Sequence, residues 1–245
     1  MSVSGALNKR KSTRAFLSKP VPKEIIEKIL DQARLAPSGD NHQPWRVAVL
    51  TGKAKSNLCN KLEQAFRSGV EPKMDYEYYP QNKASEKETE WFGSYKDNRK
   101  ACGVKLYTHL GITKQMTERR NQLYAKNYRA FDAPVMLLFF INRDLGKGSY
   151  VDYGIFLQSI MLLAVENGLA TCPQGSLSEY GDIVRQELPK HKDDIVLCGM
   201  SIGYEDDKNI INGFKQERQD IEELVTYYDW AWWLFLSSSR LNTKR

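Results

Sequence analysis

The run A-P-V-M-L-L-F-F-I-N occupies residues 133–142, and its apolar part, Ala133 to Ile141, is the longest uninterrupted apolar stretch in the chain. A continuous apolar run of strand length is typical of a strand buried on both faces. It is much shorter than the roughly 20 residues that span a bilayer. We therefore expect Pro134 to Asn142 to be a central strand covered on both sides, and we expect no membrane span.

Two further strands and several helices are predicted around this strand. Trp45 to Thr51 and Ile195 to Gly203 have the apolar character of strands, and Leu169 to Thr171 is a short extended piece. Apolar periodicity and the positions of proline and glycine predict helices at 1–18, 21–36, 53–69, 96–110, 113–128, 152–167, 178–188 and 220–230. Strands separated by helices indicate a mixed α/β or α+β sheet with helices on both faces.

The chain length favours one domain. A chain of 245 residues is within reach of one large domain and short for two. We therefore expect a single domain over residues 1–245. Residues 70–95 have no apolar period and are rich in charge and tyrosine, which indicates an insertion that runs over the surface as a lid near a site.

Composition and motif searches argue against several function classes. The four cysteines form no CxxC pair and the three histidines lack metal-ligand spacing, so no metal site is expected. No apolar segment of signal-peptide type begins the chain, and we expect a cytoplasmic protein. The net charge of +6 suits phosphate-bearing cofactors as well as nucleic acid. Because the basic residues are spread along the chain, we expect neither nucleic acid nor a membrane as a partner.

Two segments near the N-terminus could carry a binding site. In R-K-S-T-R-A-F, residues 10–16, Arg10 and Arg14 share one face of the predicted helix and could clamp a phosphate with Ser12. The alternative is a solvated basic terminus. In A-P-S-G-D-N-H-Q-P-W, residues 36–45, two prolines bound a loop in which Gly39 allows close approach of a ligand. The alternative is an ordinary connection between a helix and a strand.

Two later segments have a similar character. G-L-A-T-C-P-Q-G-S, residues 168–176, ends in a Pro/Gly turn whose backbone N–H groups could bind a flat heterocycle, although a plain turn would read the same way. N-G-F-K-Q-E-R, residues 212–218, ends in Arg218, which is either a second phosphate ligand or a surface arginine. The dinucleotide fingerprint G-x-G-x-x-G and the Walker A loop are both absent, so any nucleotide is bound by another device.

Together, and in this order, these four segments resemble the FMN-dependent nitroreductase superfamily. Residues 10–16 look like its phosphate-binding signature, and residues 36–45 and 168–175 look like its second and third signatures. Residues 127–135 and 198–204 resemble a longer subgroup, which includes enzymes that act on nitrobenzoate-like compounds. The resemblance covers roughly residues 7–228. Its strength lies in the number of short matches that occur in one order.

The resemblance implies an α+β fold with a central mixed, mainly antiparallel sheet flanked by helices. It also implies an intertwined homodimer with one FMN at each of two subunit interfaces. The expected contacts to the FMN phosphate are Arg10, Lys11, Ser12 and Arg218. The expected contacts to the flavin ring are Arg14 and Arg129 at the pyrimidine edge, Pro173, Gln174 and Gly175 near N5 and O4, and Pro37, Ser38, Gly39 and Asn41 from the other subunit.

The expected function follows from the cofactor. The flavin carries the chemistry, and no catalytic side chain is predicted. We expect a ping-pong reaction in which hydride passes from NAD(P)H through flavin N5 to a nitroaromatic, quinone or similar electron-poor acceptor. The alternatives are another reaction on the same fold (a flavin-consuming or dehalogenating reductase) and a non-catalytic flavin- or nucleic-acid-binding protein. Residues 219–245, rich in tryptophan, match no segment of the family, and we expect a packing arm on the partner subunit.

Overall fold

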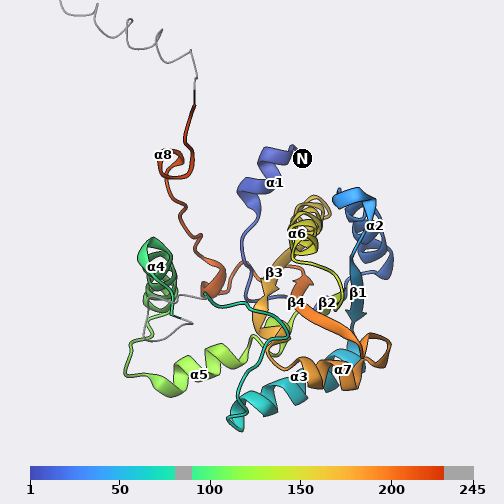
Figure 1. The fold of residues 1–245 in the computed structure, drawn as a ribbon. Helices are drawn as coiled ribbons and strands as arrows, with labels where there is room; N and C mark the ends of the chain where they lie inside the picture. Colours follow the sequence, from blue (N-terminus) through green and yellow to red (C-terminus); the bar gives the residue numbers. More distant parts are fainter. Residues whose placement is uncertain (81–89, 229–245) are drawn as a thin grey trace, which may run out of the picture. The chain divides into compact units, whose positions relative to one another are not determined.

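The structure is a computed structural model that describes residues 1–80 and 90–228 (Figure 1). The chain divides into two compact units, Met1–Lys215 and Gln216–Arg245. The α-helices of the described residues are α1 (Val3–Lys9), α2 (Lys23–Ala33), α3 (Gly52–Arg67), α4 (Gly93–His109), α5 (Thr117–Ala125), α6 (Gly148–Glu166), α7 (Gly181–Glu187) and, in the second unit, α8 (Ile221–Leu224). The strands are β1 (Arg46–Leu50), β2 (Val135–Asn142), β3 (Ala170–Gln174) and β4 (Asp194–Gly203).

The four strands form one sheet in the order β1-β2-β4-β3. Each of the three pairings between these strands of the described chain is antiparallel. The two apolar strands occupy the centre, where Leu137 of β2 pairs with Val49 on one side and with Met200 on the other. The expected α+β fold with a mainly antiparallel sheet is therefore confirmed, and the predicted strands begin and end close to the observed ones.

Strand β2 has a different hydrophobic core on each face. Leu137 and Phe139 belong to a cluster that contains side chains of α2 and α6, whereas Met136 and Leu138 belong to one built with α3 and α7. Figure 1 shows α2 and α6 on one side of the sheet and α3 and α7 on the other. Because successive side chains of a strand point to opposite faces, only a continuous apolar run can fill both cores. Burial of each large apolar side chain contributes roughly 1.5–3 kcal/mol.

Helix α6 passes a test of length and composition for crossing a membrane, and it is the one helix of the described residues that does so. It spans 19 residues, and 44% of the tested window is buried inside the protein. Its buried side chains, which include Tyr153, Phe156 and Ile160, pack in the same core as α2 and one face of the sheet. These contacts are those of the core helix of a globular protein.

The N-terminal helix was predicted over 1–18, and this prediction is wrong beyond Lys9. Helix α1 ends there, and the next residues run beside β3, where Ser12 forms a parallel bridge with Thr171. The main-chain N–H of Leu17 donates to the carbonyl of Tyr204. An edge strand offers unpaired backbone groups, and pairing with them overrides a weak local helix preference. Arg10 and Arg14 therefore do not share a helical face.

The helix predicted over 220–230 is also wrong in extent. Helix α8 has four residues, Ile221–Leu224, and residues 225–228 are not helical. Ile221 and Leu224 are exposed, so no packed face stabilises a longer helix in the described residues. Residues 229–245, including the tryptophans of the predicted packing arm, lie outside the described residues, as do residues 81–89 of the predicted insertion.

Candidate functional site

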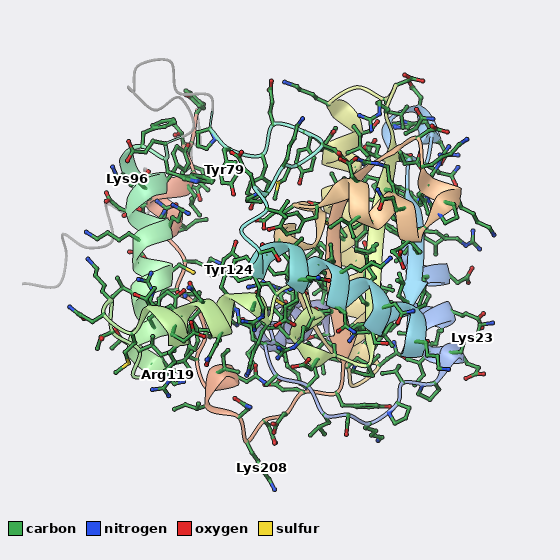
Figure 2. The ribbon with its side chains drawn as sticks, turned by 90° about the horizontal axis from the view of Figure 1, so that it is seen from below. Lys23, Tyr79, Lys96, Arg119, Tyr124 and Lys208 are labelled. Atoms are coloured by element: carbon green, nitrogen blue, oxygen red, sulfur yellow. The ribbon has the colours of Figure 1, made fainter. Side chains whose placement is uncertain are left out.

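A cavity of about 440 Å³ lies between the N-terminal segment, the insertion, α4, α5 and the turn after β3. Its wall is largely aromatic, through Tyr78, Tyr79, Trp91, Tyr124 and Phe131. Its polar lining consists of Arg14, Arg99, Asn127, Gln174, Ser176 and Glu179. Figure 2 shows Tyr79 and Tyr124 in the part of the molecule where α4 and α5 lie. Cavities of this size, apolar with a few convergent polar groups, are typical of small-molecule sites.

Arg14 reaches the cavity through the pairing of its segment with β3. The N–H of Thr13 donates to the carbonyl of Thr171 at 3.0 Å, and the N–H of Arg14 donates to Oδ1 of Asn212 at 2.8 Å. Asn212 is only 2% exposed, and its Nδ2 donates to the carbonyl of Ala15 at 2.8 Å. Asn212 thus ties the N-terminal segment to the end of the first unit. The sequence drew attention to residues 212–218 because of Arg218, and it gave no sign that Asn212 holds the N-terminal segment.

Arg10, Lys11 and Ser12 have different surroundings. Nζ of Lys11 donates to the carbonyl of Asn212 at 2.6 Å and forms an ion pair with Glu205 at 2.7 Å. The Lys11 side chain is therefore committed to the fold. Arg10 lines a small cavity of about 30 Å³ together with Thr171. Nε of Arg10 and Oγ1 of Thr171 are buried and have no hydrogen-bond partner among the described residues.

Orphaned buried donors of this kind are rare in folded proteins, because each costs about 1–3 kcal/mol when it is left without a partner. A bound anion is one way to satisfy them. Ser12 lies between the two arginines and contacts Thr171 through its backbone bridge. The segment 10–16 therefore places Arg10, whose Nε has no partner among the described residues, beside β3, and it places Arg14, whose Nη1 donates to the Ser12 carbonyl at 3.2 Å, at the large cavity.

The turn at Pro173, Gln174 and Gly175 lines the same cavity as Arg14. Nε2 of Gln174 donates to the carbonyl of Asn127 at 2.9 Å, and the hydroxyl of Ser201 contacts Oε1 of Gln174. These contacts hold the Gln174 side chain inside the protein. A Cβ atom on Gly175 would lie 3.4 Å from Cε of Met74 and 3.7 Å from the ring of Tyr78. The absence of a side chain at Gly175 therefore keeps this part of the cavity open.

The loop that contains Pro37, Ser38, Gly39 and Asn41 does not line this cavity of the described protomer. Its backbone is strained, because Asn41 has a φ of 58° and its neighbours Asp40 and Gln43 have φ values of 46° and 47°. Residues held at positive φ cost on the order of 1–3 kcal/mol each and cluster at ligand clamps.

This loop is anchored on the first turn of α6. The N–H of Gly39 donates to Oδ1 of Asp152 at 3.2 Å. Nε2 of His42 lies 3.0 Å from Oγ of Ser149 and 3.2 Å from Oδ2 of Asp152. The side chain of Ser38 is used within the loop, where Oγ accepts from the N–H of Gln43 at 3.0 Å. The strained conformation is thus fixed by buried polar groups of a core helix.

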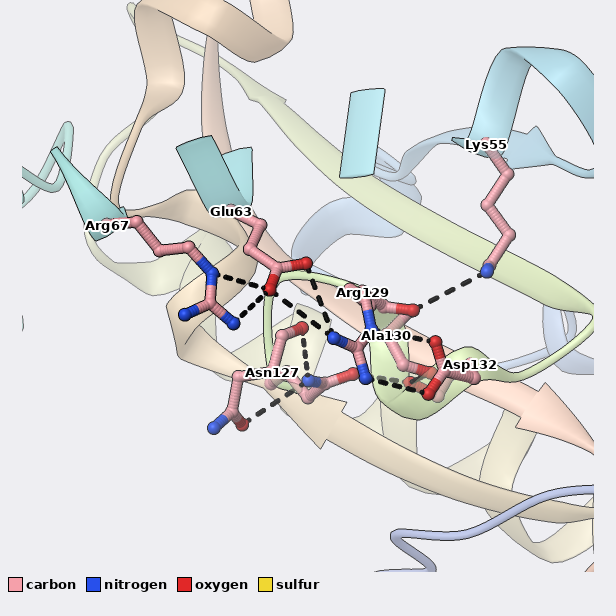
Figure 3. Close-up of polar contacts among 9 residues, drawn as sticks. Lys55, Glu63, Arg67, Asn127, Arg129, Ala130 and Asp132 are labelled. Carbon is pink, nitrogen blue, oxygen red and sulfur yellow. Dashed lines mark hydrogen bonds and ion pairs between the residues drawn. The ribbon is translucent and has the colours of Figure 1, made fainter. Parts of the chain in front are cut away.

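Arg129 is a brace within the fold (Figure 3). Nε of Arg129 donates to Asp132 at 2.9 Å, and Nη1 forms an ion pair with Glu63 at 3.3 Å. The hydrogen bond from Arg129 to Asp132 raises the pKa of the guanidinium group. Arg129 does not line the large cavity, whereas Phe131 does. Ala130, Phe131 and Asp132 have φ values of 52°, 50° and 59°, so the brace supports a strained turn at the cavity wall.

Arg218 belongs to the second unit. Its Nη1 donates to the carbonyls of Gln216 and Glu217 at 3.1 and 2.9 Å. The predicted pairing of Arg218 with Arg10 at a phosphate stays a prediction.

The cavity contains one buried carboxylate that sequence reasoning missed. Glu179 is 6% exposed, and its pKa is raised because burial penalises the charged form. Burial also raises the pKa of the Cys172 thiol to about 11 and that of Cys198 to about 12, so these thiols are not nucleophiles near neutral pH. Within residues 1–80 and 90–228, no group of three or more His, Cys, Asp or Glu side chains could hold a metal ion.

The antiparallel sheet is covered by helices on both faces, and an arginine from the N-terminal segment shares one cavity wall with the Pro-Gln-Gly segment. The chain belongs to the nitroreductase family, whose sequence profile matches residues 7–204. It is therefore an enzyme, an oxidoreductase of that family. The resemblance seen in the motifs is confirmed.

Among proteins of established activity, the chain is 35% identical to the chloronitrobenzene nitroreductase of Comamonas testosteroni, over 92% of this chain and 96% of that protein. It is 35% identical to the 4-nitrobenzoate reductase of Pseudomonas putida, over 86% of this chain and 88% of that protein. Among solved structures, the FMN and NADPH-dependent nitroreductase NfnB from sphigopyxis sp. strain HMH is 34% identical, with a TM-score of 0.88 over 94% of this chain and all of that one.

Proposed function

We propose that this protein is an FMN-dependent nitroreductase that passes hydride from NAD(P)H to nitroaromatic acceptors, as a cytoplasmic homodimer. The observation that carries the proposal is the placement of Arg14 and the turn at Gln174 and Gly175 on one cavity wall, through the pairing of the N-terminal segment with β3. Relatives named for nitroaromatic substrates and a structural neighbour named for FMN and NADPH support it.

The residues present fit FMN. The buried Nε of Arg10 and Oγ1 of Thr171 have no partner in the described chain, and a phosphate accepts hydrogen bonds from both types of group. In this proposal Arg10 and Ser12, with Arg218, hold the phosphate, and Arg14 faces the pyrimidine edge. The structure assigns the Lys11 side chain to Asn212 and Glu205, so Lys11 contributes through its backbone. When bound, the flavin supplies hydride chemistry that side chains lack.

The protein's own groups position and shield the reactants. A guanidinium group such as that of Arg14 stabilises negative charge on a reduced ring and so favours reduction. The aromatic wall of Tyr78, Tyr79 and Tyr124 suits a flat acceptor, because stacked rings gain about 0.5–1.5 kcal/mol beyond the area that they bury. The Gln174 side chain is held by Asn127 and Ser201, which keeps the turn rigid for a ring that lies against its backbone.

Exposed apolar side chains support the homodimer. Val151 and Ile155 of α6 are 68% and 40% exposed and lie four positions apart, on one face of the helix. Val3 and Leu7 of α1, also four positions apart, are exposed as well. A second protomer would cover such patches. In the proposal the strained loop at Ser38 to Asn41 then closes over the flavin of the neighbouring protomer.

The absorption spectrum of the purified protein tests the proposal. We expect a flavin spectrum, bleaching by NADPH or NADH without oxygen, and recovery of the colour when nitrobenzene is added. A protein that stays colourless after incubation with FMN overturns the cofactor assignment. Bleaching that is reversed by oxygen but by no nitroaromatic would favour a reductase of another substrate on the same fold. Sedimentation at the mass of a single chain would overturn the dimer.

A further inference from the structure

Glu179 is a buried carboxylate on the wall of the proposed acceptor site. It follows η3 (Gly175–Ser178), the 3₁₀ turn that begins at Gly175, so the same turn that the flavin is proposed to contact also places this carboxyl group. Its main-chain carbonyl accepts from the N–H of Lys73 at 2.7 Å. Glu179 lines the 440 Å³ cavity and also a second cavity of about 420 Å³. Glu179 therefore contributes to the walls of both cavities.

Two tyrosine hydroxyls converge on this carboxyl group. The hydroxyl of Tyr124 donates to Oε1 of Glu179 at 3.4 Å, and the hydroxyl of Tyr128 donates to Oε2. Tyr124 is on α5 and lines the 440 Å³ cavity (Figure 2), and its side chain is partly exposed. Tyr128 is buried and does not line that cavity. Of the two tyrosines that donate to Glu179, Tyr124 is the one that lines the cavity.

No cation of the described residues forms an ion pair with Glu179. The titratable groups whose pKa values it perturbs are the hydroxyls of Tyr79, Tyr124, Tyr128 and Tyr180. Charged groups on the two cavity walls that it shares are Arg14 and Arg99 in one and Glu71, Lys73, Asp75, Arg143, Asp182 and Arg185 in the other. A buried carboxyl group without an ion pair costs stability, and such groups concentrate at functional sites.

We propose that Glu179 and Tyr124 form a proton relay that delivers the proton needed when a nitro acceptor in the cavity is reduced. The inference rests on the proposed function and assigns it a proton source. Tyr124 is proposed as the catalytic residue, because it lines the cavity and its hydroxyl contacts Glu179. Glu179 acts through Tyr124 as the proton reservoir.

The step balances with one hydride and one proton. Reduction of a nitro group to a nitroso group breaks one N–O bond, and the released oxygen leaves as water. Of the two hydrogens in that water, one arrives as the hydride, which carries both electrons. The other is the proton, which passes from the Tyr124 hydroxyl to the nitro oxygen. For this step the Tyr124 hydroxyl turns its hydrogen from Oε1 of Glu179 to the nitro oxygen. The protonated Glu179 carboxyl group then donates its proton to the Tyr124 oxygen, and the carboxylate regains a proton from water.

The test uses the FMN-loaded protein, reduced without oxygen and mixed with one of two oxidants in a stopped-flow instrument. Nitrobenzene needs a proton, whereas ferricyanide takes single electrons and needs none. For Glu179→Gln and for Tyr124→Phe we expect reoxidation by nitrobenzene to slow by roughly 10²-fold, with less than about a threefold change for ferricyanide. Glu187→Gln, which removes a surface ion pair with Lys61, is the matched control and keeps both rates.

The pH profile separates a relay from a structural role. A proton donor works while it is protonated, so the wild-type rate with nitrobenzene falls as pH rises through the pKa of Glu179. Glu179→Gln abolishes that fall. The hydrogen bond from Tyr128 lowers the pKa of Glu179, so Tyr128→Phe moves the fall to higher pH.

Three results overturn the relay alone: equal slowing with both oxidants, an unchanged rate with nitrobenzene, or a pH-dependent fall that persists in Glu179→Gln. A wild-type protein that is reduced by NAD(P)H and reoxidised by ferricyanide but not by nitrobenzene overturns the proposed acceptor as well. The failure of the relay and the failure of the proposed function are therefore distinguishable.

Discussion

The main-chain N–H of Arg14 donates a 2.8 Å hydrogen bond to Oδ1 of Asn212, a residue 198 positions further along the chain. Nδ2 of the same side chain donates to the carbonyls of Ala15 and Asp206. One buried amide therefore makes three backbone contacts and sets the path of the segment that carries Arg14. The position of a proposed cofactor ligand thus depends on a residue that does not line the cavity.

Replacing Asn212 with alanine should loosen this segment. We expect Asn212→Ala to lower the free energy of unfolding by about 2–3 kcal/mol, because buried backbone groups lose their partners. FMN affinity should fall with it, by about tenfold, since Arg14 is no longer held in place. Urea unfolding and fluorescence titration with FMN measure the two effects. Asn209→Ala, which removes one local contact to the N–H of Ile211, is the control and should change both much less.

Arg10 and Lys11 are adjacent, but the structure gives them different roles. We expect Arg10→Gln to weaken FMN binding by about 10- to 100-fold, because a charge-assisted hydrogen bond contributes about 1.5–3 kcal/mol. Its stability without FMN should stay near the wild-type value. Lys11→Gln should lower the stability of the protein and leave FMN affinity nearly unchanged, because it loses the contacts to Asn212 and Glu205. Equal effects of the two substitutions on FMN affinity would contradict this division.

Arg99 is a cavity cation on α4 for which no ion pair is found in the described residues. We expect Arg99→Gln to lower kcat/KM for 4-nitrobenzoate by about tenfold, because a charge pair in a partly shielded cavity contributes about 1–2 kcal/mol. Nitrobenzene, which has no charge, should be nearly unaffected. In the control Lys96→Gln, the lost cation lies one turn away on the same helix, pairs with Glu90 and does not line the cavity. A matching loss for both substrates would argue against a role in acceptor charge recognition.

Glu179 should destabilise the folded protein at neutral pH. Because burial raises its pKa, the folded protein holds this proton to a higher pH than the unfolded chain does. Stability is then lost as pH rises from the unfolded pKa to the folded pKa and stays lower above it. Glu179→Gln removes the ionisation, so we expect it to unfold at a higher temperature than wild type at pH 8, with the difference shrinking toward pH 4. Thermal unfolding of both proteins between pH 4 and pH 8 measures this difference. A difference in unfolding temperature that does not depend on pH would contradict the raised pKa of Glu179.

Several elements could be predicted because their causes are local. The apolar run at 135–142 is a buried strand, since no polar residue interrupts it and both of its faces meet apolar partners. Gly168, with a φ of 74°, ends the core helix as a glycine after a helix often does. Proline and glycine predict a turn at 173–175, and the turn begins at Gly175, since Pro173 and Gln174 still pair with β4. In each case the residue type itself favours the observed backbone conformation.

The remaining features could not be predicted because their causes are distant in the sequence. The segment after Lys9 has no strand pattern, and it is extended because β3 offers it hydrogen bonds. The role of Arg129 at the flavin ring stays a prediction, and only the fold shows that Glu63 and Asp132 form ion pairs with it. Glu179 lies in the polar segment predicted as a helix over 178–188, and its burial among Tyr124 and Tyr128 depends on residues more than 50 positions away in the sequence.

The sequence alone therefore determined the buried strands, the turn chemistry and the family, because apolar runs, proline and glycine act through local geometry and because short motifs occur in a recognisable order. Only the tertiary structure decided which charged groups are free to meet a ligand. Lys11 and Arg129 are paired within the fold, whereas Arg10, Arg14 and Glu179 line cavities without an ion pair among the described residues. The physical reason is that pairing and burial depend on neighbours that folding brings together from distant parts of the chain.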